Sequence, residues 1–306
     1  MDYERHGRVL TPLFFPFPAG VLLQHAACTR TNTLILAFND NCEQFPGGRN
    51  PTTPHITTSP DDGLSWTNAT AMAVAQPGTG VYGTNVVIGL SRGLALFNAS
   101  LASQTRLIMP AETGTLYSDD HGATWTAVLD RAIGEGAIAR CTPGACGGAP
   151  GGSAKFAMAI RGGPPDSVSI KFSNDSVHWT RPRPLPGIAP YSSYGQAPGL
   201  IATPGGLVLS HGGRGAVPPL LGAGGGPDHN RNLTGHGDGN GCDLFESTDG
   251  VSWTLRQHIW PFQTGYTTMV ETKVDVNGAA EEFALIIESG GIMCSDQMLA
   301  FFNFTA

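Results

Sequence analysis

Lysine and charged residues are scarce in this chain. Only three of its 306 residues are lysine, and charged residues make up 13% of the sequence. Phosphate binding needs clustered lysine and arginine, and the sequence has no such cluster and a formal net charge of −7. We therefore expect no nucleic-acid partner, and an anionic ligand has to be bound by individual arginines.

Long apolar runs are also absent. No stretch reaches the roughly 20 residues that span a bilayer, and the start, MDYERHGRVL, lacks the apolar core of a signal peptide. Five Asn-x-Ser/Thr sequons and six cysteines nevertheless suit a secretory route. We expect no membrane span, and the location stays open, with the sequons and cysteines favouring a secreted or lumenal one.

The cysteines show no spacing typical of a metal site, so we expect neither a metal nor another cofactor. Cys141 and Cys146 flank a Thr-Pro-Gly-Ala turn and are able to close a small loop. The other four cysteines have no partner that can be recognised from the sequence.

Glycine and proline are abundant, with 42 and 23 residues. Together with the scarcity of charge, this composition is poor for surface helices and suits short strands joined by turns. Short apolar or alternating runs support this interpretation. They lie at 33–38, 106–109, 157–160, 207–210 and 283–287. The composition therefore predicts an all-β chain.

A short motif recurs four times and sets the expected architecture. SPDDGLSW and SDDHGATW both fit Ser-x-Asp-x-Gly-x-x-Trp, while SNDSVHW and STDGVSW are shortened copies. We number them boxes 1 to 4, at Ser59–Trp66, Ser118–Trp125, Ser173–Trp179 and Ser247–Trp253. Their spacing allows about one four-stranded sheet per box, which gives four blades. The residues after Trp253 suit a fifth blade and part of a sixth, which the N-terminal run RVLTPLFF is able to close. The sequence therefore predicts a single six-bladed β-propeller over residues 1–306.

Each box is expected to form the turn between the two outer strands of a blade. The aspartate carboxylate accepts hydrogen bonds from backbone N–H groups of its own turn, and glycine supplies a positive φ. The tryptophan is expected to bury its ring against adjacent strands. The four box aspartates are thus interpreted as structural and not as acids or metal ligands.

The boxes and the segments between them resemble the sialidase family. GEGAIAR with Glu135, FAMAIRG with Arg161 and GLVLSHGG followed by Arg231-Asn232-Leu233 occur in the family order. Gly265-Tyr266-Thr267-Thr268 and FALIIE with Glu288 follow, also in that order. The resemblance implies an Asp-box propeller that releases terminal sialic acid from glycoconjugates, with a sialylated glycan or another acidic sugar as its partner.

The residue types suit that chemistry. Sialic acid carries a carboxylate at its anomeric carbon, which guanidinium groups bind bidentately. A carboxylate nucleophile would meet that charge, and sialidases attack with tyrosine instead. The resemblance makes Tyr266 the nucleophile and Glu135 its base, with Arg161 and Arg231 binding the carboxylate and Glu288 orienting an arginine.

The sequence departs from the family near its start. Pro16 stands where the family has its first arginine, and Arg49-Asn50 stand where it has the acid/base aspartate. We assign Asp40 as a displaced proton donor. Two alternatives stay open: a non-catalytic propeller that binds acidic glycans or a protein partner, and a hydrolase of the same fold acting on a different sugar.

Overall fold

The computed structural model describes residues 25–28, 33–39, 54–75, 93–97, 105–111, 114–129, 135–161, 168–185, 188, 197–212, 240–274, 279–289 and 296–303. The regular elements of this part are all β-strands, which confirms the all-β class. Within these residues no helix is present that has the length and apolarity to cross a membrane. The chain divides into two compact units, each described by itself, so the six-bladed ring and the single domain stay predictions.

One unit comprises residues 14–138 and 175–178 and contains two sheets. The first sheet is antiparallel and follows chain order: β1 (His25–Cys28), β2 (Leu34–Asn39), β3 (Pro54–Ser59) and β4 (Thr70–Ala71). The second contains β6 (Leu94–Phe97), β7 (Thr105–Ala111), β8 (Gly114–Ser118) and β9 (Trp125–Leu129), with β5 (Val74–Ala75) parallel to β9. Each thus has the sequential four-stranded arrangement expected of a blade.

The two sheets of this unit share an apolar core. Ile35 and Ala37 of β2 pack with Leu107 and Met109 of β7 and with Trp125 of β9. Apart from Trp125, which comes from box 2, these side chains come from the short apolar runs of the sequence, so the residues that predict strands also form the core.

The other unit comprises residues 1–13, 139–174 and 179–306, and the division falls within β10 (Gly136–Arg140). β10 is followed in its sheet by β11 (Phe156–Arg161), β12 (Val168–Ser173) and β13 (Arg183–Pro184). A six-stranded sheet follows, with β14 (Gly199–Thr203), β15 (Gly206–Gly212), β16 (Asn240–Ser247), β17 (Thr254–Val274), β18 (Ala280–Ser289) and β19 (Asp296–Asn303) in chain order.

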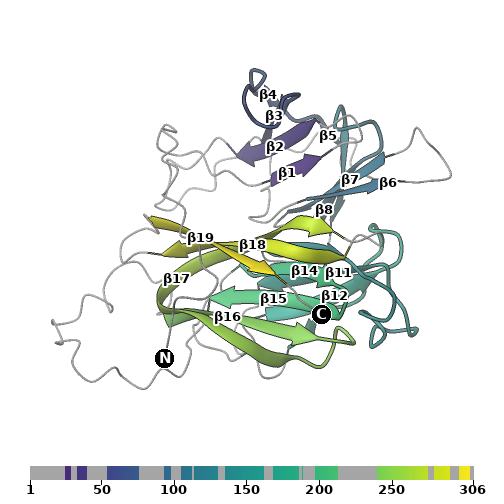
Figure 1. Cartoon of the computed structure of the whole chain (residues 1–306). Coiled ribbons are helices and arrows are strands. Elements are labelled where there is room, and N and C mark those ends of the chain that lie inside the picture. The colour runs from purple at the N-terminus through teal and green to yellow at the C-terminus, as the bar shows by residue number, and fades with distance from the viewer. Residues whose placement is uncertain are drawn as a thin grey trace, which may run out of the picture. The chain divides into compact units, whose positions relative to one another are not determined.

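The six-stranded sheet is continuous because β17 belongs to both of its halves (Figure 1). The first part of β17 pairs with β16, and the second part pairs with β18. Its two halves enclose a common core that includes Val208, Leu244, Met269 and Phe283. β17 therefore links two blade-like sheets without an intervening loop.

All four boxes join the third and fourth strands of their sheets, as predicted for turns between outer strands. In box 2 the Asp120 carboxylate accepts hydrogen bonds from the Thr124 N–H at 2.8 Å and from the Ser118 hydroxyl at 2.7 Å. Asp61 and Asp249 accept equivalent bonds in boxes 1 and 4, and Asp175 accepts backbone N–H groups in box 3. The turn-holding role of the aspartates is thus confirmed.

The glycines of the boxes adopt the expected backbone conformation. Gly63, Gly122 and Gly250 have φ values of 88°, 94° and 79°. In box 3 Ser176 occupies the corresponding position with a φ of 66°, a conformation that side chains resist. The same turn is therefore formed without its glycine at a cost in backbone strain.

The two full boxes differ in how far their tryptophan rings are buried. Trp125 of box 2 is 1% exposed, but Trp66 of box 1 is 40% exposed, so the expected burial is wrong for Trp66. Both indoles donate to the carbonyl of their box glycine, at 3.0 Å and 3.1 Å. The difference arises because Trp125 packs into the core shared by two sheets, whereas Trp66 is outside that core.

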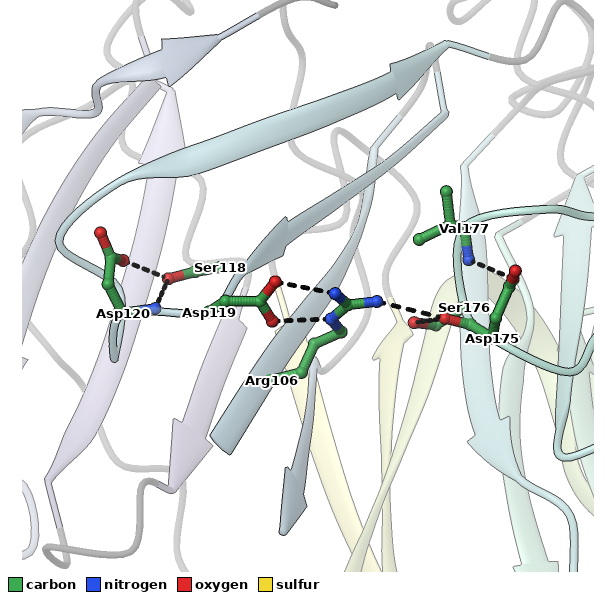
Figure 2. A network of polar contacts seen from close by, with 7 residues as sticks. All are labelled: Arg106, Ser118, Asp119, Asp120, Asp175, Ser176 and Val177. Carbon is green, nitrogen blue, oxygen red and sulfur yellow. Dashed lines mark hydrogen bonds and ion pairs between the residues drawn. The ribbon is translucent and has the colours of Figure 1, made fainter. Parts of the chain in front are cut away.

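An arginine connects box 2 to the start of box 3 (Figure 2). Arg106 donates from Nε and Nη2 to the two carboxylate oxygens of Asp119, both at 2.7 Å, and from Nη1 to the Asp175 carbonyl at 3.3 Å. Its guanidinium also lies 4.5 Å from the centre of the Tyr117 ring. Bidentate geometry and ring stacking make this arginine a specific link between two turns that are far apart in the sequence.

Cys141 and Cys146 form a disulfide, which confirms the small loop expected from the sequence. The segment that follows β10 is bound to other parts of its unit. The Gly148 N–H donates to the Asp249 carbonyl of box 4 at 2.9 Å, and the Thr142 hydroxyl donates to the Thr203 carbonyl at 3.2 Å. Cys242 is a buried free thiol and does not take part.

Removing this disulfide is expected to destabilise the protein moderately. The bridge closes a loop with a sequence separation of 5, for which chain entropy gives about 2 kcal/mol of the free energy of unfolding. Urea unfolding of the double variant C141S/C146S measures this loss. Wild-type protein in reductant is the control and should match the variant, and a variant as stable as the oxidised wild type would contradict the expectation.

Candidate functional site

In the unit that contains residues 139–174 and 179–306, the strand directions place the ends of β11 and β15 at the same end of their sheets. β12 and β16 both run into their boxes, at Ser173 and Ser247. Their antiparallel partners β11 and β15 therefore end away from the boxes, at Arg161 and Gly212. The ends of β11 and β15 define a rim opposite boxes 3 and 4.

Tyr266 lies at this same end because of the path of β17. The strand begins beside box 4 at Thr254 and runs away from it, so that Gln263 pairs with Asn240, the first residue of β16. Tyr266 follows three residues later, where β17 passes from one half of the sheet to the other.

A β-bulge contains Tyr266. Thr264 pairs with Ser289 and Thr267 pairs with Ile287, so β17 advances three residues while β18 advances two. A bulge bends the strand and changes the direction of a side chain, and bulges are frequent next to active sites. Gly265 precedes Tyr266 in the bulge.

Arg161 and Tyr266 are brought together, as the family order predicts. Arg161 Nη1 donates to the Tyr266 hydroxyl oxygen at 3.3 Å, and the guanidinium carbon is 6.0 Å from the centre of the ring. Both side chains are partly exposed, so a ligand has access to them. A positive charge beside a phenol favours its ionised form, which is the nucleophilic one.

A pair of buried hydroxyls lies directly beside the bulge. Ser210 Oγ donates to Thr267 Oγ1 at 2.9 Å, and Thr267 Oγ1 donates to the Ser210 carbonyl at 3.1 Å. The sequence singles out the Ser-His element of β15 and the Gly-Tyr-Thr-Thr step, but not that they bond to each other. Their contact depends on the bulge, which no sequence pattern specified.

A second polar pair was missed by the sequence analysis. His258 Nδ1 lies 2.7 Å from the Asp243 carboxylate across β16 and β17. Burial raises the pKa of Asp243, although the hydrogen bond with His258 lowers it in part. A register shift between Phe245 and Leu244 brings these residues opposite each other, so counting outward from box 4 along the two strands would have paired Asp243 with Gln257 instead.

The places of the other predicted site residues relative to Tyr266 stay predictions. Glu135 precedes β10, is half-buried and belongs to the first unit, so its approach to Tyr266 stays a prediction. Glu288 lies in β18 opposite Gln297, and its side chain is outside the described part. Asp40 and Arg231 also lie outside the described residues.

His211, next to Ser210, is expected to make stability depend on pH. It is 3% exposed, its Nε2 has no hydrogen-bond partner among the residues that the structure describes, and burial lowers its pKa to about 4. The unfolded chain, with an ordinary histidine pKa of about 6.5, binds a proton that the folded chain excludes. The contribution of neutral His211 to the free energy of unfolding is complete above about pH 6.5 and is lost as the pH falls to about 4. The loss amounts to at most about 3 kcal/mol.

Urea unfolding at several pH values compares wild type with His211→Gln. The variant should lose less stability than wild type between pH 6.5 and 4, while the exposed control His121→Gln should follow wild type. Asp243, the cross-strand neighbour of His211, is unchanged in all three proteins. Parallel profiles for wild type and His211→Gln would contradict the expectation.

Comparisons with known proteins support the fold. No family profile and no curated protein sequence matches this chain. A Hadza microbial sialidase is similar with a TM-score of 0.58 and 15% identity, over 91% of this chain and 52% of its own. An intramolecular trans-sialidase from Ruminococcus gnavus is similar with a TM-score of 0.50 and 18% identity, over 83% of this chain and 50% of its own.

An α-L-arabinofuranosidase from Fusarium graminearum is also similar, with a TM-score of 0.50 and 11% identity, over 89% of this chain and 72% of its own. The chain spans about half the length of the two sialidases. At these identities the likeness concerns the fold alone. The chain has the sialidase-like fold of the propeller-type glycoside hydrolases.

Proposed function

We propose that this chain is a retaining exo-α-sialidase that uses Tyr266 as its nucleophile. The observation that supports the proposal is the hydrogen bond from Arg161 to the Tyr266 hydroxyl at 3.3 Å, at the rim opposite the boxes. Glycosidases that act on sialic acid are the class that attacks with tyrosine. A guanidinium at this distance favours the phenolate that such an attack requires.

Two arginines bind the substrate in this proposal. Arg161 and Arg231 hold the sugar carboxylate, and Glu288 orients an arginine through its own charge. A guanidinium has five N–H donors, so Arg161 is able to bind a carboxylate while one N–H remains directed at Tyr266.

The reaction has two displacements. Tyr266 Oη attacks the anomeric carbon while Glu135 accepts the phenol proton, and the glycosidic C–O bond breaks as Asp40 protonates the departing oxygen. A water then attacks the anomeric carbon and gives its proton to Asp40. The bond to Tyr266 breaks, and the phenolate recovers its proton from Glu135. Two inversions leave the anomeric configuration unchanged.

A second candidate function is binding without cleavage. Pro16 occupies the place of an arginine in the family pattern, and Arg49-Asn50 occupy the place of the acid/base aspartate. Loss of a proton donor lowers the rate of hydrolysis about 10²- to 10⁴-fold. The contact between Arg161 and Tyr266 still allows a carboxylate to bind. This candidate is a propeller that binds an acidic glycan or a protein partner.

The deciding experiment incubates the full chain with three probes. These are a fluorogenic α-sialoside, an α-L-arabinofuranoside with the same fluorophore, and free sialic acid in titration calorimetry. Release from the sialoside alone, with the α-anomer as first product by proton NMR, is the expected result. Binding of sialic acid without release supports the second candidate, and release from the arabinofuranoside alone refutes both.

A further inference from the structure

Tyr266 lies at a shift in the register of the β17–β18 ladder. Thr264 pairs with Ser289, and the next register pair is Thr267 with Ile287. A nucleophile has to be held close to its productive position, and a bulge sets the direction of its side chains through the way its flanking residues are anchored. Thr267, directly after Tyr266, is such a flanking residue.

Thr267 is bound to two strands of the other half of the sheet. Its N–H donates to the Ala197 carbonyl, just before β14, at 3.2 Å. Its hydroxyl donates to the Ser210 carbonyl of β15 at 3.1 Å and accepts from Ser210 Oγ at 2.9 Å. The residue that follows Tyr266 thus has three hydrogen bonds that cross from one half of the sheet to the other.

These bonds lie in a tightly packed region. Thr267 is 2% exposed and Ser210 is fully buried. A Cβ on Gly199 would come within 2.5 Å of Ser210 Oγ and 3.0 Å of the Met269 N atom, so the strands meet here at a distance that only glycine permits. Losing one buried hydroxyl leaves its partner without a hydrogen bond, which is costly at such a site.

We propose that Thr267 and Ser210 are positioning residues that hold Tyr266 beside Arg161. They act through the backbone of the bulge and touch neither substrate nor reacting atoms. The role as an aid to catalysis rests on the proposed function, whereas the placement of Tyr266 is independent of it. The result is that β15 controls the geometry of a side chain on β17.

The test uses Thr267→Val, which keeps the shape and removes the hydroxyl, and Thr267→Ser, which restores it. Thr272→Val makes the same change on an exposed position of the same strand and is the matched control. We expect Thr267→Val to lower kcat about 10²-fold through displacement of the reacting oxygen, with a much smaller change in KM. Thr267→Ser should recover most of the loss, and Thr272→Val should behave as wild type.

A spectroscopic readout separates this inference from the proposed function. The carbon NMR signal of [ζ-¹³C]tyrosine-labelled protein, assigned to Tyr266 by its loss in Tyr266→Phe, should shift in Thr267→Val and not in Thr267→Ser. An unshifted signal in folded Thr267→Val overturns the inference, whether or not a sialoside is cleaved. If Thr267→Val does not fold, Ser210→Ala takes its place, because it leaves the bond from Thr267 to the Ser210 carbonyl intact.

Discussion

Tyr266→Phe is expected to lower kcat for sialoside hydrolysis by about 10³-fold or more, because it removes the only atom of this side chain that can bond to the anomeric carbon. The ring remains in place, so the change in KM should be small. Initial rates with a fluorogenic α-sialoside, fitted for kcat and KM separately, measure both effects. A variant that keeps more than a tenth of the wild-type kcat would show that Tyr266 is not the nucleophile.

The chain offers a matched control for this substitution. Tyr117 also lies beside an arginine, with the Arg106 guanidinium 4.5 Å from its ring, but it belongs to β8 and to the first unit. Tyr117→Phe makes the same chemical change in a similar environment and keeps the ring that Arg106 contacts. Its activity should equal that of wild type.

Trp125→Ala should cause the largest loss of stability among single substitutions in the boxes. The ring is 1% exposed, packs with Ile35 and Leu107, and donates its indole N–H to Gly122. Truncation of a buried tryptophan leaves a cavity and costs about 3–5 kcal/mol of the free energy of unfolding. Denaturant unfolding, followed by circular dichroism, measures the shift in midpoint.

Trp66→Ala is the control because box 1 has the same turn with an exposed ring. Its indole N–H makes the same bond to a glycine carbonyl, so the two variants lose the same hydrogen bond and differ in burial. We expect Trp66→Ala to cost no more than about 1.5 kcal/mol, since only a hydrogen bond and a partly buried surface are lost. Equal losses in the two variants would contradict the account.

Local features of the fold were predictable from the sequence. The box turns depend on bonds between residues at most four positions apart, such as Asp120 to Thr124. The apolar runs around them form strands because they alternate or are bounded by turn residues. The disulfide between Cys141 and Cys146 likewise closes over a separation of 5. Such interactions can be derived from neighbouring residues.

Features that depend on packing between sheets were not predictable in this way. Trp66 and Trp125 occupy the same position in their boxes, and only the surrounding sheets decide which one is buried. The bond between Ser210 and Thr267 needs the one-residue shift of the bulge, which changes every pairing beyond it. Alternation within one strand contains no information on such a shift.

For the candidate site, a family resemblance took the place of geometry in the prediction. Arg161 and Tyr266 are 105 positions apart, and no local pattern links them, yet the family order placed them in one site and the structure brings them into contact. Glu135, Arg231, Glu288 and Asp40 come from the same source, and their places around Tyr266 remain predictions.

The 21 residues of β17 also affect how this part of the chain unfolds. A strand shared by two sheets cannot leave one of them without disturbing the backbone hydrogen bonds of the other. The six strands from β14 to β19 should therefore open as one cooperative unit, with similar amide-exchange protection on both sides of Tyr266. The bulge then lies inside a cooperative block and not at a hinge, which favours a rigidly held Tyr266 over one carried by a moving loop.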